Sequence, residues 1–431
     1  MKNIKLYRKE VFLATLFLLI TELAYICYAA IFFDSHHTLP TPLALLDTND
    51  SFMDFYNTAW WGNTSLMYEM WQSIYPPFVF WITRIISTSD CNSITSLYFR
   101  DCYPEGVVYI FVTQALACFV STLAIGKYIR LNNIHKIILT FVLYFSMPSL
   151  FLLERGNLLC FALLFVALSV IVPNRYLKVI FLTFAVNIKQ YLVVLELSFL
   201  FYQKLKVIIF SGVLLVLIYL LSIAMIGSNG SELIIENMLG FVGDGAVSRF
   251  EKMWYPTSFG AWTYVAFNEQ LSFASFSDLE VVIFKALAII LRVLSVSISL
   301  TSVFLAIYKN KIIEEEYFQL IMLLCLISTV NAVGGYSLVL IFPYLGILIK
   351  KINSNVLLIC IFILLFPFDY GFIPRRILEG HSFLSNQYVN VDGSLTIGSY
   401  IRPFMITFAQ ILIIKNLFLM KEKLPYDKKC N

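Results

Sequence analysis

Three carboxylates gather near the N-terminus, and aromatic residues follow them directly. The stretch 47–61 reads DTNDSFMDFYNTAWW and contains Asp47, Asp50 and Asp54. If residues 50–61 form a helix, Asp50 and Asp54 are one turn apart on the same face. A carboxylate can remove a proton from an acceptor hydroxyl or hold a divalent cation. The pattern therefore fits group transfer, and it fits equally well a helix face that only meets water.

Basic residues between apolar segments form a second candidate group. Arg155 and Asn157 belong to the sequence ERGN, and Lys189 belongs to NIKQ. Ionisable groups near membrane depth are functional candidates, although an internal ion pair, here between Lys189 and Glu196, explains them as well. Arginine recognises phosphate through its planar fork of donors. The cations that we expect to surround a lipid phosphate are Arg155, Lys189, Lys285 and Arg292.

Further candidates lie in stretches between the apolar segments. Tyr75 opens YPPF, whose two prolines predict a rigid, extended corner, and the apolar run that follows predicts a short helix at the membrane interface. A later stretch contains Arg375, Arg376 and His381, which are either solvated or in contact with a substrate. These residues add basic groups to the candidate site.

The cysteine and glycine patterns exclude several kinds of site. Five of the eight cysteines fall in apolar segments and read as small core residues. Cys91 and Cys102 share one loop, and in an oxidising compartment they either pair or stay free. The sequence has no CxxC motif and no Cys/His cluster with the spacing of a zinc site. It also has no GxGxxG motif and no P-loop. The sequence therefore predicts neither a zinc site nor a nucleotide site.

Membrane helices must position these residues. Hydrophobic residues make up 59% of the 431, and only 13% are charged; soluble domains carry about a quarter charged residues. The chain is therefore an all-α polytopic membrane protein without a separate soluble domain. The net charge of +4 follows from the basic loops that such proteins keep in the cytoplasm.

Twelve apolar segments are predicted, with a cytoplasmic N-terminus. They cover 11–33, 107–130, 137–153, 157–173, 176–188, 191–203, 206–226, 279–308, 316–332, 336–350, 354–370 and 397–420. This threading leaves most Lys and Arg inside and most Asp and Glu outside or in the membrane. Segment 176–203 is two short segments, a re-entrant hairpin or one helix; a single helix would place the basic residues that follow it outside.

The predicted domain plan alternates loops and membrane segments. A cytoplasmic N-terminus (1–10) and an anchor (11–33) precede a large periplasmic catalytic loop (34–106). The rest of the plan is membrane segments 107–226, a second outer loop 227–278, membrane segments 279–370, a third outer loop 371–396, a last segment 397–420 and a cytoplasmic tail 421–431.

The order of the motifs is similar to that of a known superfamily. An anchor helix is followed by Asp54-Phe55-Tyr56, then YPPF, then ERGNLLCFALLFVALSV and then AVNIKQYLVVLELSFL. This order resembles the GT-C glycosyltransferases, above all the bacterial polyprenol-phosphate-mannose mannosyltransferases and their relatives. The resemblance covers about residues 1–205, and it departs from the family at Gln190, where a proline often follows the lysine.

The resemblance implies a reaction and a place for it. A GT-C-like fold would move a hexose from a polyprenyl (undecaprenyl) phosphate to a surface glycan or glycolipid, such as O-antigen, at the periplasmic face of a bacterial inner membrane. Both termini would be cytoplasmic. Asp54, or else Asp50, would be the general base, while Arg155 and Lys189 would stabilise the leaving phosphate. The other expected substrate-binding residues are Tyr56, Tyr75, Asn157, Lys285, Arg292, Arg375, Arg376 and His381.

The expected partners are the lipid-linked donor, the glycan acceptor and membrane lipid, with no nucleic acid, no metal and no other cofactor.

In size and loop plan the chain also resembles the phage-borne serotype-converting glucosyltransferases of O-antigen. Two other classes stay open. An O-antigen polymerase or ligase would use paired arginines in a late outer loop, as Arg375 and Arg376 are, and a transporter or flippase would show internal repeats, which we do not find.

Overall fold

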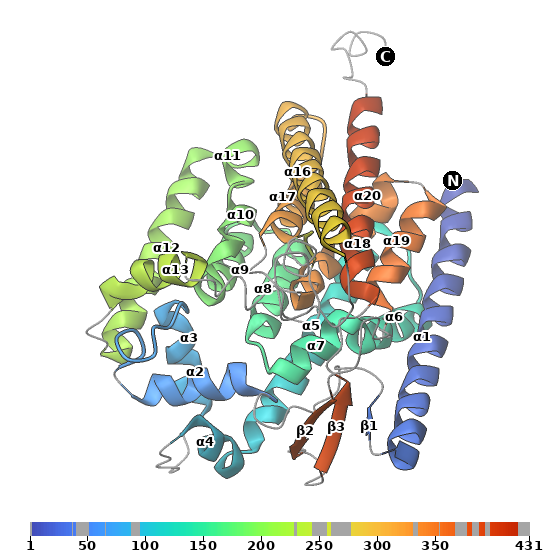
Figure 1. Ribbon diagram of the computed structural model, residues 1–431. Helices are drawn as coiled ribbons and strands as arrows, with labels where there is room; N and C mark the ends of the chain where they lie inside the picture. The colour runs from blue at the N-terminus through green and yellow to red at the C-terminus, as the bar shows by residue number, and fades with distance from the viewer. Residues whose placement is uncertain are drawn as a thin grey trace.

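The chain is mostly helical wherever its structure is described. The computed structural model describes residues 2–36, 38–39, 51–64, 66–87, 95–227, 231–243, 257–259, 277–330, 335–352, 354–366, 377–381, 388–392 and 397–420. A backbone in lipid must satisfy its own N–H and C=O groups, and a helix does this within one segment. The long apolar runs therefore appear as helices, most of them arranged side by side (Figure 1).

Five of the described helices are long and apolar enough to cross a membrane. They are α1 (Lys2–His36), α5 (Glu105–Tyr128), α12 (Leu205–Ile226), α16 (Asp278–Tyr308) and α20 (Ile397–Leu419). A bent pair, α6 (Asn133–Phe145) and α7 (Met147–Arg155), makes six if it is counted as one span. The architecture is that of a polytopic membrane protein.

The remaining apolar segments are shorter helices, at the positions that the sequence predicts. They are α8 (Leu159–Ile171), α9 (Arg175–Ile188), η1 (Gln190–Leu192), α10 (Val193–Glu196), α11 (Phe199–Tyr202), α17 (Glu315–Thr329), η5 (Gly335–Tyr344), α18 (Leu345–Lys351) and α19 (Asn355–Leu365). The core forms where α5 packs on α8, α8 on α9, and η5 on α5 and α7.

The predicted outer loops also contain helices. In the first loop these are α2 (Met53–Asn63), α3 (Pro77–Ile86) and α4 (Ser96–Cys102). Among the described residues of the second they are η2 (Ser231–Leu233) and α13 (Ile234–Gly243). The helix expected after YPPF is therefore present as α3, and Pro77 occupies its first turn, where a missing N–H costs nothing.

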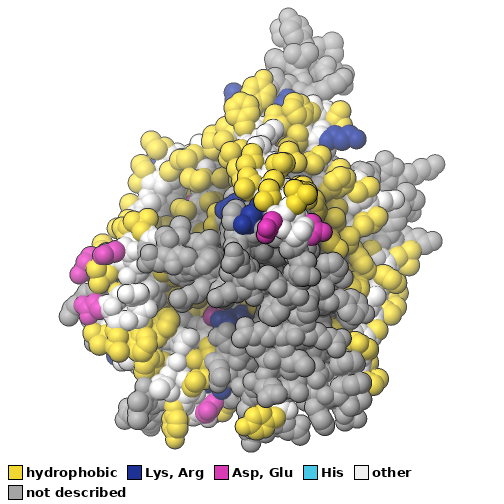
Figure 2. Space-filling view, in the orientation of Figure 1, with side chains coloured by type: hydrophobic (Ala, Val, Ile, Leu, Met, Phe, Trp, Pro, Cys, Tyr) yellow, Lys and Arg dark blue, Asp and Glu magenta, His cyan; other side chains and the backbone are white. Residues whose placement is uncertain are grey.

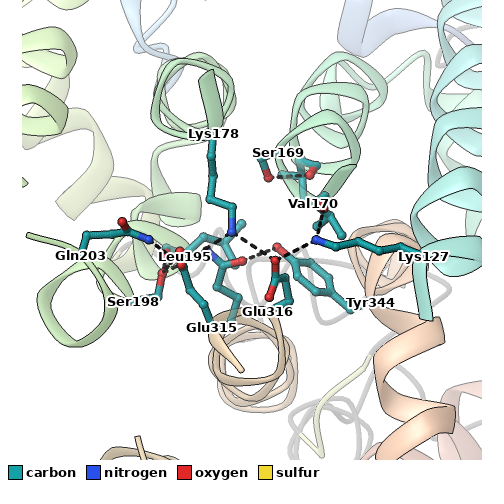
Figure 3. A network of polar contacts seen from close by, with 12 residues as sticks. Lys127, Ser169, Val170, Lys178, Leu195, Ser198, Gln203, Glu315, Glu316 and Tyr344 are labelled. Carbon is teal, nitrogen blue, oxygen red and sulfur yellow. Dashed lines mark hydrogen bonds and ion pairs between the residues drawn. The ribbon is translucent and has the colours of Figure 1, made fainter. Parts of the chain in front are cut away.

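Segment 175–203 turns back on itself, and two contacts drawn in Figure 3 show this. Lys178, near the start of α9, and Gln203, just after α11, both contact Oε2 of Glu315, at 3.6 and 2.6 Å. In one straight helix residues 178 and 203 would be roughly 37 Å apart at 1.5 Å per residue. The chain therefore reverses at Lys189, and the single-helix alternative for 176–203 is wrong.

The same network ties four elements together at one end of the molecule. Glu316, in the first turn of α17, accepts from Lys178 and from Lys127 of α5, each at 3.2 Å. Lys127 also donates to the carbonyl oxygen of Val170, at the end of α8, at 2.8 Å. Two lysines and two glutamates thus hold α5, α8, α9 and α17 in fixed register, at the end of α5 that is away from the predicted outer loops.

A small sheet that the sequence did not predict accompanies the helices of the predicted all-α fold. β1 (Thr38–Leu39), β2 (Ile377–His381) and β3 (Tyr388–Asp392) form it in the order β1-β3-β2. β1 pairs in parallel with β3, and β2 pairs with β3 in the antiparallel direction. The sheet joins the first and third predicted outer loops. Strands this short have no periodicity to detect, and only tertiary proximity makes them pair.

The visible surface agrees with a lipid environment. Apolar side chains cover much of the surface over the long helices in Figure 2. Among them, Val213 and Leu220 on α12 and Ile290 and Val293 on α16 are more than half exposed. Exposed apolar area of this extent marks a contact surface, and on long apolar helices the contact is lipid.

Candidate active site

Asp54 and Arg155 form the centre of the candidate site. Nη2 of Arg155 donates to Oδ1 of Asp54 at 3.0 Å, and Nδ2 of Asn157 donates to Oδ2 at 2.5 Å. Both side chains of the ion pair are largely buried, with 14% of Arg155 and 19% of Asp54 exposed. One carboxylate thus receives two side-chain hydrogen bonds from a hairpin far away in the sequence.

The first turn of α2 is held directly on this hairpin. The backbone N–H of Phe52 donates to the carbonyl oxygen of Glu154 at 2.8 Å. Nη1 of Arg100 in α4 donates to the carbonyl oxygen of Ser51 at 3.2 Å. Asp54 lies in the first turn of α2, where the helix dipole stabilises a carboxylate. Two anchors therefore fix the position from which Asp54 projects.

Gly156 allows this close approach. Its φ of 61° is left-handed and ends α7 as glycine commonly does. A Cβ at this position would lie 2.8 Å from Cα and 2.9 Å from the carbonyl oxygen of Phe52. The glycine of ERGN is thus required for two reasons. Its backbone is left-handed, and no side chain fits between it and the backbone of Phe52.

Lys189 brings a second cation to the site. It follows α9 at the hairpin tip, and its Nζ donates to the hydroxyl of Tyr75 at 3.2 Å while lying 4.3 Å from the Tyr75 ring centre. Burial lowers the pKa of Lys189 to about 8, and the Asp54 carboxylate opposes this shift. Burial raises the pKa of Tyr75 well above its ordinary value, with Asp54 acting in the same direction. Tyr75 therefore keeps its proton as a donor.

Gln190, the residue after Lys189, has a contact of its own in the structure. Its Nε2 donates to the carbonyl oxygen of Ile74 at 2.7 Å, directly before Tyr75. The side chain thus ties the hairpin tip to the corner that YPPF makes. Tyr336 of η5, whose ring contacts that of Phe151, also lies near Asp54, Arg155 and Asn157. Sequence reasoning assigned no role to Gln190 or Tyr336, because neither belongs to a charged pattern.

The group formed by Asp54, Tyr75, Arg155, Asn157 and Lys189 is called the Asp54 cluster below. It combines one carboxylate with two cations and a protonated phenol, in partly buried positions. Each carboxylate oxygen has a second lone pair, so that a hydroxyl can still donate to Asp54. Arginine, lysine and tyrosine are donors suited to a phosphate group. The arrangement can accept a proton beside a site for an anion.

Other predicted residues have different surroundings in the structure. Tyr56 is fully buried, and its hydroxyl donates to the carbonyl oxygen of Tyr103 at 2.7 Å, so that it packs the core. Arg292 is exposed on α16, and Lys285 is half-buried on the same helix. Glu196 accepts from Thr183 and Ser211 instead of Lys189. The alternative of a Lys189–Glu196 ion pair is therefore wrong.

Some predictions concern residues outside the described part of the chain. These are Asp47, Asp50, Cys91, Arg375 and Arg376. His381 ends β2, and its side chain is not described. Cys102 is disulfide-bonded, which agrees with one half of the predicted pair. The pairing with Cys91 stays a prediction.

Comparison with known proteins adds no assignment. No protein-family model matches the chain, and no curated protein matches it either. The GT-C resemblance therefore stays a prediction drawn from motif order.

Proposed function

We propose that the chain is a GT-C-type membrane glycosyltransferase that moves a hexose from a polyprenyl phosphate to a glycan or glycolipid acceptor such as O-antigen. The observation that carries the proposal is the meeting of Asp54 with Arg155 and Asn157. Tyr75 and Lys189 lie beside them. These five groups come from four motifs, namely Asp54-Phe55-Tyr56, YPPF, ERGN and NIKQ, which are spread over about 135 residues of the sequence. A carboxylate beside two cations provides both groups that the transfer needs.

The reaction is a single displacement. The acceptor hydroxyl donates its proton to Asp54 while its oxygen attacks the anomeric carbon of the donor sugar. The bond from that carbon to the phosphate oxygen breaks, and its electron pair stays on the phosphate. Arg155 and Lys189 stabilise the negative charge that develops there, and positioned charges act strongly where water is excluded. Attack opposite the leaving group inverts the anomeric configuration.

Asn157 and the hairpin orient the base. Asn157 holds Oδ2 of Asp54 and also accepts at Oδ1 from the backbone N–H of Leu159 at 3.0 Å. The amide is thus fixed at both ends, and so is the carboxylate plane. We assign Asn157 a positioning role and Asp54 the proton transfer.

The cluster belongs on the outer face in this proposal. Figure 1 places the start of α1 and the end of α20 towards one end of the molecule, and α2, α4 and the strands towards the other. The Lys127–Glu316 contact lies at the far end of α5, whose 24 residues span about 36 Å at 1.5 Å per residue. The basic loops gather around that end. With basic loops in the cytoplasm of a bacterium, the Asp54 cluster is periplasmic.

The direct test is transfer by purified protein in lipid nanodiscs. The donor is undecaprenyl-phosphate-glucose with a radiolabelled sugar, and the acceptor is lipopolysaccharide. Asp54→Asn should lower the transfer rate by about 10²- to 10⁴-fold. Asp101→Asn is the matched control, because Asp101 is an exposed carboxylate of the same loop that pairs with Arg100. An Asp54→Asn protein with an unchanged rate would remove the general base from the proposal.

A second readout separates the other two classes. In cells that make the lipid-linked donor, loss of a polymerase leaves single unpolymerised repeat units on the surface. Loss of a flippase leaves the lipid-linked sugar on the inner leaflet, and the purified protein would not consume the donor. Loss of the proposed transferase removes only the added hexose, and the chain length of the glycan stays the same.

A further inference from the structure

One face of α2 stays partly exposed along the whole helix. Its partly exposed or exposed residues are Asp54, Asn57, Trp60, Trp61, Asn63 and, at the C-cap, Thr64, while the other side chains of α2 are buried. Positions 54, 57, 61 and 64 recur every three to four residues and so line up on one side of the helix. This row is called the α2 stripe below. It starts at the proposed base and leads away from it.

Aromatic rings surround the far half of the stripe. Trp61 belongs to the stripe itself, and Trp60 and Trp71 lie beside it. The ring of Trp71 stacks on Trp61 with centres 6.1 Å apart and meets Trp60 edge-on at 4.8 Å. Within the described part of the chain, the indole N–H of Trp71 makes no hydrogen bond. Asn57, between Asp54 and the indoles, likewise has no hydrogen bond to a described residue. The indole N–H of Trp71 is buried, and the partly open faces of Trp60 and Trp61 lie on the same helix as Asn57, a partly exposed amide that still has hydrogen-bonding capacity.

Trp71 is held in place by a strained turn. Gln72, the next residue, has a φ of 46°, which is uncommon for a residue other than glycine. The turn is fixed by Asn237 of α13, whose Nδ2 donates to the carbonyl oxygens of Tyr68 at 2.9 Å and Ser73 at 3.2 Å. Strained backbone that its surroundings fix in this way is characteristic of ligand-binding positions.

Charge divides the site into two halves. Arg155 and Lys189 are found at the Asp54 end, where they suit the donor phosphate. Beyond Asp54 the stripe itself carries amide, indole and hydroxyl groups and no cation. From Asp54 to Trp61 the helix rises about 10 Å at 1.5 Å per residue, longer than a single sugar ring. The stripe is thus neutral, polar and aromatic, and long enough for an oligosaccharide end.

We propose that the α2 stripe binds the acceptor as a neutral glycan. The apolar face of a sugar ring stacks on Trp61, its hydroxyls bond to Asn57, and the hydroxyl to be glycosylated reaches Asp54. Ligand sites commonly combine aromatic walls with a few polar groups in this way. That the bound glycan is the acceptor rests on the proposed function; that the stripe binds neutral sugar does not.

Saccharide binding tests this directly. Saturation-transfer NMR on the full chain in nanodiscs uses the methyl glycosides of glucose, galactose, mannose, rhamnose and N-acetylglucosamine as probes. At least one should bind, and Trp61→Ala should weaken its binding by about tenfold. Trp61→Phe, which keeps an aromatic ring, should restore most of the affinity. Undecaprenyl phosphate, which we place on the cations, should not compete.

Two variants guard against misfolding and against a membrane-anchoring role. Asn57→Ala removes only a partly exposed amide and should weaken binding by about threefold. Trp81→Ala is the control, since Trp81 is a partly exposed tryptophan of the same loop that packs on Phe78 of α3. If no glycoside binds, or if Trp81→Ala weakens binding as much as Trp61→Ala, the tryptophans only anchor the loop and the proposal falls.

The same assay keeps the two proposals separate. Asp54→Asn should lower the transfer rate by about 10²- to 10⁴-fold and leave glycoside binding within about twofold, because stacking and the Asn57 contacts do not need the base. Binding at the stripe without any transfer would overturn the proposed function alone. Transfer that depends on Asp54 but not on Trp61 or Asn57 would overturn the stripe alone.

Discussion

Asp54 and Arg155 are 101 residues apart in the chain, and their side chains meet at 3.0 Å. The pair joins the first turn of α2 to the end of α7, and a backbone hydrogen bond from Phe52 to Glu154 runs beside it. The base and the nearest cation are therefore built as one unit. A change to either residue should disturb the other.

This unit predicts non-additive kinetics. Arg155→Gln should lower transfer by about tenfold or more, because the developing phosphate charge loses a cation and Asp54 loses a fixed orientation. The double variant with Asp54→Asn should be hardly slower than Asp54→Asn alone. Rates of the four proteins in the nanodisc assay form the cycle. Effects that multiply would mean that the two side chains act independently.

Lys189 predicts a loss of activity above about pH 8. Its pKa is lowered to about 8 by burial, so that it gives up its charge as the pH rises through that value and then no longer stabilises the phosphate. Lys189→Arg should move this alkaline limb to higher pH, since arginine stays charged. A pH–rate profile of both proteins is the measurement. Lys204→Arg, at an exposed lysine before α12, should leave the profile unchanged.

The lowered pKa of Lys189 also predicts that the activity lost above about pH 8 is not caused by unfolding of the protein. An unfolded lysine keeps its proton to about pH 10.4, whereas folded Lys189 gives it up near pH 8. Between these values the unfolded chain binds more protons, and the contribution of Lys189 to stability therefore rises with pH. Thermal unfolding at pH 7 and pH 9 checks the sign. A stability loss that disappears in Lys189→Met would contradict it.

Gly156 and Gly227 form a matched pair for testing the close approach of α2. Both have left-handed φ, 61° and 65°, but a Cβ meets Phe52 at Gly156 and nothing within 4 Å at Gly227. Gly227→Ala should lower the free energy of unfolding by about 1 kcal/mol, because alanine is strained in the left-handed conformation. Gly156→Ala should cost about 2 kcal/mol more, because the backbone of Phe52 must move, and it should also reduce transfer. Unfolding midpoints that fall equally would show that contact with Phe52 does not matter.

The disulfide at Cys102 predicts an oxidising compartment for the first loop. Without reductant, a thiol-reactive polymer should not label Cys102, and peptide mapping should recover it joined to Cys91. A disulfide that closes the loop from Cys91 to Cys102 contributes about 3 kcal/mol to the free energy of unfolding. Cys102→Ser should therefore lower the unfolding midpoint. Cys27→Ser, at a free cysteine of α1, is the control. A labelled Cys102 would place the loop in a reducing compartment.

The sequence alone determined the helices and the chemical types of the candidate groups. Hydrophobic length depends on local composition, and so the apolar runs marked long helices such as α5, α12, α16 and α20 within a few residues. The capping chemistry was equally local, since Pro77 begins α3 and Gly156 ends α7. Asp54, Arg155, Asn157 and Lys189 were recognised because charged and amide groups beside apolar segments are rare.

Only the tertiary structure decided which of these groups meet. Arg155 reaches Asp54 while Arg292 stays exposed on α16, although both looked alike as cations in apolar segments. The hairpin at Lys189, the pairing of β1 with β3 and the tie from Gln190 to Ile74 all join residues that are distant in sequence or unremarkable in type. Such contacts depend on how helices pack against one another, and local composition carries no record of that packing.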